Sequence, residues 1–221
     1  MAGLILIVGL VGACTSGTQT ALTPADRAVR LAVSGCGASS ATTGSGFVFD
    51  DGLVITAAHT VARAGQVGVT YPDGSTVAAE LVALDTERDV AALTVPIVDV
   101  ERPLIGTAEA GDVGQVVGGL ASGSVDMTVR QYVNLSIEEV LGTERHSRLG
   151  YEIDAPTGDG DSGAGVYDPD GRLVGMVFAV SANGGSTWVT ASQEIDQFVA
   201  TVDRQGVPYV CNPERSRMEP Q

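Results

Sequence analysis

Short apolar runs alternate with glycine-bearing turns along most of the chain after residue 30. Three stretches, at 46–59, 66–84 and 163–180, each contain an apolar run, a turn with an Asp-Gly pair and a second apolar run. Apolar runs of this length joined by such turns predict β-hairpins. Their regular spacing predicts an all-β barrel or sandwich.

Two of these hairpins resemble each other. "GSGFVFDDGLVIT" at 44–56 and "GAGVYDPDGRLVGM" at 163–176 share glycines, an aromatic or apolar strand and an Asp-Gly turn. This similarity suggests two related β lobes that meet near 103–115. We therefore predict an N-terminal lobe over 31–106 and a C-terminal lobe with a helix over 107–203.

The end of the second lobe changes to a helical pattern. Thr190 and Gln193 match a capping box, and Gly206 is a plausible terminator. Between them, four apolar residues share one helical face: Ile195, Phe198, Val199 and Val202. This pattern predicts a single helix packed on the lobe. The remaining residues, 204–221, are too few for another domain and are expected to form a tail.

The N-terminal segment has the features of an export signal. Residues 1–13 carry no charged side chain, and the apolar run ends at Cys14. It is too short to span a bilayer as a helix and is typical of a signal sequence. "LVGAC" also resembles a bacterial lipobox, which predicts lipidation of Cys14 and a membrane tether; the alternative is a buried N-terminal strand. Residues 15–30 read as a polar linker, in which Thr23 and Pro24 predict one helical turn.

Composition and charge narrow the classes of partner. The formal net charge is −15, so binding to nucleic acid or to an anionic lipid surface is disfavoured. The 29 glycines suit tight turns between strands. The sequence does not define an oligomeric state.

The cysteines also favour a location outside the cytosol. If Cys14 belongs to the signal, Cys36 and Cys211 remain, and they lie near opposite ends of the folded part. A disulfide between them would contribute about 4–5 kcal/mol in the loop-entropy model. Such bonds persist in the periplasm, in the cell envelope and in secreted proteins. The alternative is two unrelated buried thiols.

Ser162 lies in the glycine-rich and acidic stretch "APTGDGDSGAG", which suggests a nucleophile on a sharply bent loop. A serine hydroxyl needs a base, and the base needs an orienting carboxylate. His59 follows an apolar strand, whereas His146 lies in a charged stretch that reads as an exposed loop. Asp89 begins an apolar strand and is the preferred carboxylate; the alternatives are Asp85, in an exposed turn, and Asp99, between the lobes.

Three motifs carry a family resemblance: "TAAH" at 56–59, "DVAAL" at 89–93 and "GDSG" at 160–163. Their order and spacing resemble the trypsin-like serine endopeptidases, and among these most closely the actinobacterial periplasmic acid-resistance proteases. The resemblance implies two six-stranded antiparallel β-barrels with a C-terminal helix. It also implies hydrolysis of protein or peptide substrates with no metal and no cofactor.

The resemblance assigns roles to individual residues. His59 is the base, Asp89 orients it and Ser162 is the nucleophile, with the N–H groups of Gly160 and Ser162 as the oxyanion hole. Asp161 is expected to make a buried structural contact. "GDSGAG" has Ala164 where the family usually has glycine, which brings turnover into question.

The substrate pocket follows from the same resemblance. Pro156 occupies the position at its base, which disfavours a preference for Arg or Lys. Its wall is expected from Phe178, Ala179 and Val180, so we expect apolar or small substrate side chains.

Two alternatives from other classes remain open. One is a catalytically impaired protease-like domain that binds peptides or a partner, and the other is a purely structural extracellular β domain. The structural reading predicts that the three motifs lie far apart, and the binding reading predicts no reaction at Ser162.

Overall fold

The computed structural model describes residues 22–96, 100–119, 123–181, 185–214 and 216–220. The expected signal with Cys14 and the start of the linker therefore lie outside the described residues, as does Asp99. No helix within the described ranges has the length and apolar character needed to cross a membrane.

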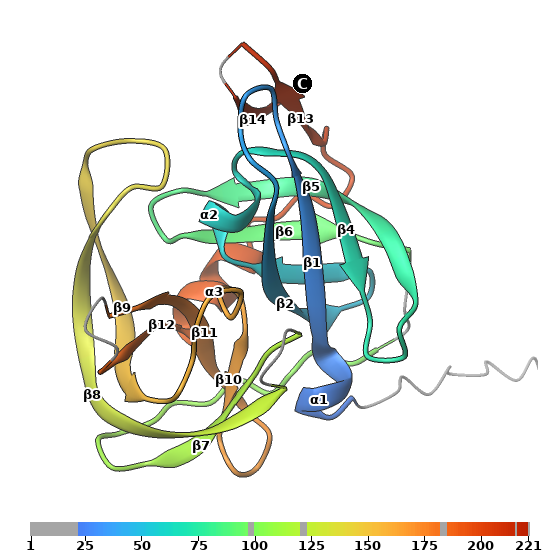
Figure 1. Cartoon of the computed structure of the whole chain (residues 1–221). Coiled ribbons are helices and arrows are strands. Elements are labelled where there is room, and N and C mark those ends of the chain that lie inside the picture. Colours follow the sequence, from blue (N-terminus) through green and yellow to red (C-terminus); the bar gives the residue numbers. More distant parts are fainter. Residues whose placement is uncertain (1–21, 97–99, 120–122, 182–184, 215, 221) are drawn as a thin grey trace, which may run out of the picture.

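The first half of the chain forms a closed six-stranded antiparallel barrel with the strand order β1-β2-β3-β6-β5-β4 (Figure 1). The predicted hairpins at 46–59 and 66–84 are confirmed as the β2–β3 and β4–β5 pairs. The strands of this barrel are β1 (Ala28–Gly35), β2 (Thr42–Asp50), β3 (Leu53–Thr56), β4 (Ala64–Thr70), β5 (Thr76–Asp85) and β6 (Val90–Thr94).

The second half repeats this architecture. Its strand order is β10-β11-β12-β9-β8-β7, and the third predicted hairpin is the β10–β11 pair. The fold is thus the predicted pair of six-stranded antiparallel barrels. The strands of the second barrel are β7 (Val113–Val117), β8 (Ser124–Glu138), β9 (Arg145–Asp154), β10 (Gly165–Tyr167), β11 (Leu173–Val180) and β12 (Thr187–Ala191).

The two barrels share a hydrophobic core at their interface. Strands β2 and β3 are buried on both faces, since Val48 and Val54 point into the first barrel while Phe47 and Ile55 point toward the second. Tyr167 of the second barrel joins the interface core. Continuous apolar runs, rather than alternating ones, are what strands covered on both faces require.

Three short helices complete the described fold: α1 (Pro24–Arg27), α2 (Ala58–Val61) and α3 (Ser192–Val199). The predicted turn at α1 is confirmed, with Thr23 capping it. The predicted capping box at α3 is wrong. Thr190 is a buried residue of β12 paired with Met176, and Ala191 precedes the helix without a side-chain cap. Strand pairing therefore overrides the local capping pattern.

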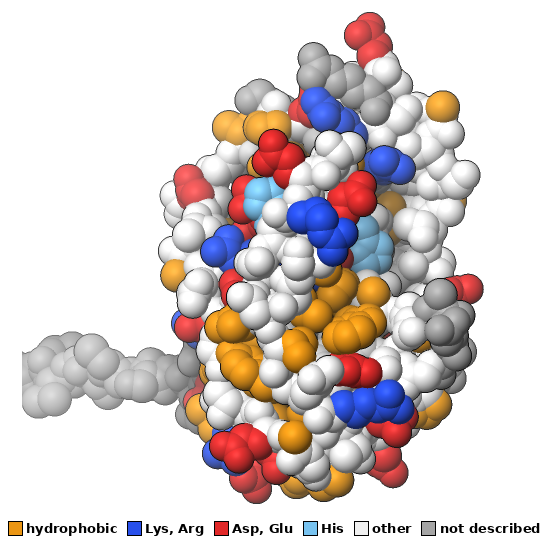
Figure 2. Space-filling view, turned by 90° about the vertical axis from the view of Figure 1, so that its left-hand side faces the viewer, with side chains coloured by type: hydrophobic (Ala, Val, Ile, Leu, Met, Phe, Trp, Pro, Cys, Tyr) orange, Lys and Arg blue, Asp and Glu red, His pale blue; other side chains and the backbone are white. Residues whose placement is uncertain are grey.

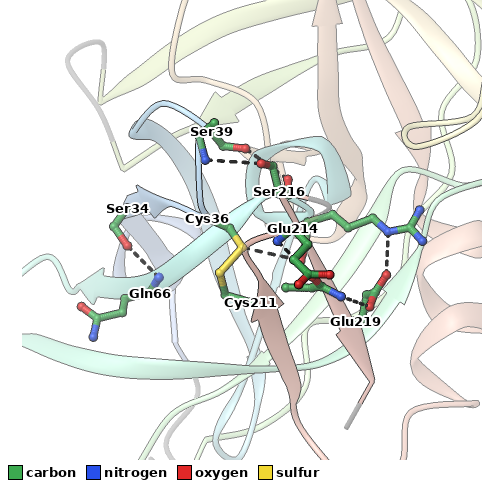
Figure 3. The surroundings of a disulfide bond; sticks show 11 residues. Ser34, Cys36, Ser39, Gln66, Cys211, Glu214, Ser216 and Glu219 are labelled. Carbon is green, nitrogen blue, oxygen red and sulfur yellow. Dashed lines mark hydrogen bonds and ion pairs between the residues drawn. A yellow bond between two sulfur atoms is a disulfide. The ribbon is translucent and has the colours of Figure 1, made fainter.

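The segment expected as a tail contains a hairpin. Strands β13 (Tyr209–Asn212) and β14 (Arg217–Pro220) pair and pack on the first barrel, where Met218 is buried and its N–H donates to the carbonyl of Ala62 at 2.8 Å. A Cys36–Cys211 disulfide joins the hairpin to the end of β1 across a sequence separation of 175 residues (Figure 3). The bridge and Met218 together tie the C-terminus to the first barrel.

Replacing both Cys36 and Cys211 by serine should lower the free energy of unfolding by about 2–5 kcal/mol, because the unfolded chain loses its long closed loop. Chemical denaturation of the oxidised protein measures this change. The matched control is Cys14→Ser, which removes the third cysteine and should leave the unfolding free energy unchanged. Equal stability of the double variant and the control would contradict the assigned role of the bridge.

Candidate active site at the barrel interface

His59 and Asp89 meet because neighbouring strands of the first barrel end beside each other. Strand β3 pairs with β6 through Thr56 and Ala91; α2, with His59, follows β3, and Asp89 precedes β6. The Nδ1 atom of His59 lies 2.8 Å from Oδ2 of Asp89, and the backbone N–H of His59 donates to Oδ1 at 2.8 Å. The carboxylate therefore fixes both the ring and the backbone of the histidine.

Asp89 is held in an uncommon conformation. Its φ of 54° is in the left-handed region, and only 3% of the residue is exposed. Its carbonyl accepts the N–H of Ala58 at 3.2 Å, which ties it to the first turn of α2. A non-glycine residue in this region costs about 1–3 kcal/mol and persists only where its surroundings enforce it.

The pKa of His59 is shifted by opposing causes. Burial lowers it, but the hydrogen bond with Asp89 and the negative charge of Asp89 outweigh burial, so the pKa of His59 is raised above 6.5. The side chain remains 39% exposed. The ring is thus anchored on its Nδ1 side and accessible elsewhere, as a proton acceptor must be.

Ser45 of the first barrel holds the loop that carries Ser162. The N–H of Ser45 donates to the carbonyl of Ser162 at 2.8 Å, and its hydroxyl donates to the carbonyl of Gly160 at 2.9 Å. The N–H of Gly119, in the second barrel, donates to the same hydroxyl at 3.2 Å. One residue of β2 therefore connects the serine loop and the second barrel to the first.

Gly163 allows this loop to approach closely. Its φ is +91°, and a Cβ there would lie 2.0 Å from the carbonyl oxygen of Ser45 and 2.6 Å from the hydroxyl of Thr56. That oxygen and hydroxyl are themselves bonded at 2.7 Å, so neither is free to move. Only glycine satisfies both the conformation and the space.

The serine and histidine segments meet around Gly44. A Cβ at Gly44 would lie 2.6 Å from the methyl of Thr60, the residue after His59, and 3.4 Å from the carbonyl oxygen of Ser162. Among the described residues, no hydrogen bond joins the Ser162 hydroxyl to His59. Such bonds are often long before substrate binds. The structure thus brings the three motifs together, contrary to the purely structural reading.

The backbone around Ser162 leaves two donors unused. Asp161 and Gly163 donate their N–H groups to the carbonyls of Gly158 and Val177. Within the described residues, the N–H groups of Gly160 and Ser162 donate no hydrogen bond, and Gly160 has a φ of 92°. These are the two donors expected for an oxyanion hole.

Asp161 and Ala164 support the shape of this loop. The Asp161 carboxylate is buried and accepts the N–H of Gly158 at 2.9 Å, which agrees with its expected structural role. Ala164 is fully buried and is not among the described residues with positive φ, so alanine fits there without backbone strain. Its departure from the family pattern therefore does not distort the loop.

The alternative carboxylate, Asp85, and the alternative base, His146, have partners other than the His59–Asp89 pair. Asp85 accepts N–H groups of Glu87 and Arg88, so it shapes the turn before Asp89. His146 was expected in an exposed loop, which is wrong: it lies in β9 and its ring is 3.4 Å from the carboxylate of Glu87. In the described part of the chain, no cluster of three or more His, Cys, Asp or Glu residues is placed to hold a metal ion.

The expected pocket residues differ in exposure. Pro156 and Val180 are exposed, Ala179 is half-buried, and Phe178 is buried. The guanidinium of Arg148 covers the Phe178 ring, 4.0 Å from its centroid. Figure 2 shows hydrophobic side chains gathered on one face below charged and histidine side chains.

Sequence reasoning missed Arg148. It lies in β9, only 2% exposed, and burial lowers its pKa to about 10. The surrounding letters "ERHSRLG" suggest a solvated charge run, and nothing local marks one arginine as buried. Its burial depends on the long β8–β9 hairpin, which reaches across to the first barrel. There the backbone N–H of Val140 donates to the carbonyl of Thr86 at 3.1 Å.

The paired barrels, with a histidine–carboxylate pair facing a bent serine loop, define the chymotrypsin-like class of serine peptidase folds. Comparison with protein families agrees: the trypsin-like peptidase domain matches residues 44–176. The chain belongs to this family.

Two curated relatives illustrate the similarity. "Serine protease Rv3671c" of Mycobacterium tuberculosis is 33% identical over 151 residues, which are 65% of this chain and 38% of the relative. A "Probable periplasmic serine endoprotease DegP-like" of Halomonas elongata is 29% identical over 164 residues, which are 73% of this chain and 34% of the relative. The chain thus spans little more than a third of the length of these relatives.

Solved structures give the same fold. The active-form crystal structure of the Rv3671c protease from M. tuberculosis superposes with a TM-score of 0.71 at 24% identity, over 91% of this chain and 94% of that one. An HtrA-type protease, AlgW with a tripeptide, superposes with a TM-score of 0.67 at 21% identity, over 82% of this chain and 61% of that one.

Gly163→Ala should displace the Ser162 loop, because its Cβ meets the backbone of Ser45. We expect a loss of reactivity of Ser162 toward a fluorophosphonate of about 10²-fold or more, as misplacement by about 1 Å costs that much. The matched control is Gly74→Ala, where φ is +86° but no atom lies within 4 Å of the new Cβ.

The control should cost only about 1 kcal/mol of stability, from the left-handed backbone alone, and should keep full labelling. Labelling rates, together with thermal unfolding, separate the two effects. Full labelling of Gly163→Ala would show that the close approach to Ser45 does not position the serine.

Proposed function

We propose that the protein is a serine endopeptidase that hydrolyses peptide bonds through an acyl-enzyme. The observation that carries this proposal is the buried Asp89 carboxylate bonded to His59, in a chain of the trypsin-like family whose Ser162 loop is held on the same barrel. The triad is His59, Asp89 and Ser162.

In the proposed reaction, Nε2 of His59 accepts the proton of the Ser162 hydroxyl as its oxygen attacks the substrate carbonyl. Asp89 keeps the proton on Nδ1 and stabilises the imidazolium that forms. The imidazolium then gives its proton to the departing amine, which leaves the acyl group on Ser162. Water, deprotonated by His59, releases the acid and restores the serine.

The developing negative charge on the carbonyl oxygen would be bound by the N–H groups of Gly160 and Ser162. Each such donor contributes about 3–4 kcal/mol to lowering the barrier. The hydrogen bond from Ser45 to the carbonyl of Gly160 fixes the Gly160–Asp161 peptide, which lies between these two donors in the chain.

The substrate would lie along the end of β11. Its backbone can pair beside Phe178, Ala179 and Val180, as an extended peptide adds to a strand edge. Pro156 offers no negative charge at the pocket base, so we infer a preference for apolar or small side chains. The substrates are proteins or peptides.

An extracytoplasmic location is also proposed. The Cys36–Cys211 disulfide suits an oxidising compartment, and two relatives are described as periplasmic. The proposed lipid tether at Cys14 lies outside the described residues. It requires the cysteine thiol to carry an acyl-glycerol group, which mass spectrometry of the membrane fraction would detect.

A fluorophosphonate probe tests the proposal directly. It should label the protein at Ser162, and Ser162→Ala should abolish the labelling. Ser136→Ala, at an exposed hydroxyl of β8, serves as the matched control and should label normally. Absence of labelling in the folded wild-type protein, with no cleavage of a peptide library, would favour the binding-module reading instead.

Asp89→Asn should lower kcat by about 10⁴-fold, because the wrong imidazole tautomer is favoured. It also removes the two causes that raise the pKa of His59 and leaves burial, which lowers it. Activity needs the neutral ring, so the acid limb of kcat/KM should lie above pH 6.5 in the wild type. In the residual activity of the variant it should move to lower pH. An unmoved acid limb would show that Asp89 does not control the base.

A further inference from the structure

Arg148 is a buried cation without a hydrogen-bonded partner. Only 2% of the residue is exposed, and within the described residues Nε and both terminal nitrogens of its guanidinium have no hydrogen-bond acceptor. Buried charges are almost always paired, because an isolated charge loses its hydration without compensation. The proposed mechanism so far gives this residue no role.

Three carboxylates attract this guanidinium electrostatically: Asp89, Glu194 of α3 and Asp85 at the end of β5. Two of them already have a cation, because Arg88 bonds to Asp85 at 2.7 Å and to Glu194 at 3.0 Å. Among the described residues, the only cationic group that bonds Asp89 is the ring of His59, which is charged only when protonated. Arg148 is thus a permanent cation with no hydrogen-bond partner among the described residues, and its charge is attracted to that of Asp89.

The guanidinium cannot easily move away from this position. It covers the face of Phe178, 4.0 Å from the centroid, and the N–H of the next residue, Leu149, donates to Glu194 at 2.9 Å. Cation–π contacts strengthen where water is excluded. His146, two residues before Arg148 in β9, pairs with Glu87 of the first barrel at 3.4 Å.

We propose that Arg148 is a positioning residue of the triad, a fixed buried cation that opposes protonation of His59. This inference rests on the proposed function and deepens it.

The effect on the base follows from the sign of the charge. Asp89 favours the imidazolium and so raises the pKa of His59, whereas Arg148 repels the imidazolium and lowers it. The two charges together keep the ring strongly oriented without making it too basic to work near neutral pH. Loss of Arg148 should therefore raise the pH at which the base becomes active.

The test compares Arg148→Met and Arg148→Gln, which remove the charge, with Arg148→Lys, which keeps it. Methionine preserves an apolar stem against Phe178, and glutamine preserves polarity, so either folded variant is informative. NMR titration of His59 should show its pKa raised by about half a unit to one unit in the neutral variants. The lysine variant should remain close to the wild type.

Arg88→Met is the matched control, since it removes a neighbouring cation already neutralised by Asp85 and Glu194. It should shift the pKa of His59 much less than the Arg148 variants. The acid limb of kcat/KM should move in parallel with the NMR values.

Equal shifts in the lysine and methionine variants would reduce Arg148 to a packing role and overturn the proposal. An unchanged pKa of His59 in the neutral variants would overturn it as well. The titration needs no turnover, so a failure of peptidase activity is seen separately, as absent fluorophosphonate labelling of the wild type.

Discussion

The site depends on one contact between the two barrels, the seating of the serine loop on Ser45. Two hydrogen bonds, from the N–H and the hydroxyl of Ser45, fix the carbonyls of Ser162 and Gly160. Gly163 provides the space for this contact. Since Ser45 lies in β2, which pairs with the strand leading to His59, the Ser162 loop and His59 are both held by the same sheet.

The electrostatics of the site extend this arrangement. Asp89 is buried, binds the imidazole of His59 and attracts the guanidinium of Arg148. One partner comes from the first barrel and the other from the β8–β9 hairpin of the second. The proposed chemistry therefore depends on the interface twice, for the position of the serine and for the charge balance of the base.

Much of the fold could be predicted from sequence, because Asp-Gly turns and apolar runs are local signals. His59, Asp89 and Ser162 could be proposed from sequence because motifs fix their neighbours. The false cap at Thr190 arose because pairing with β9 and β11 is not visible locally. The β13–β14 hairpin is stabilised by a disulfide and by burial of Met218, both long-range. Arg148 was missed for the same reason, since tertiary contacts bury it.

The most direct test is a crystal structure of the protein after reaction with a small phosphonate ester that mimics the tetrahedral intermediate. The account predicts a covalent bond from Ser162 Oγ to phosphorus. It also predicts one phosphoryl oxygen within hydrogen-bond distance of the N–H groups of Gly160 and Ser162, with His59 Nε2 beside the serine oxygen. A phosphoryl oxygen turned away from both N–H groups, or modification at another residue, would contradict it.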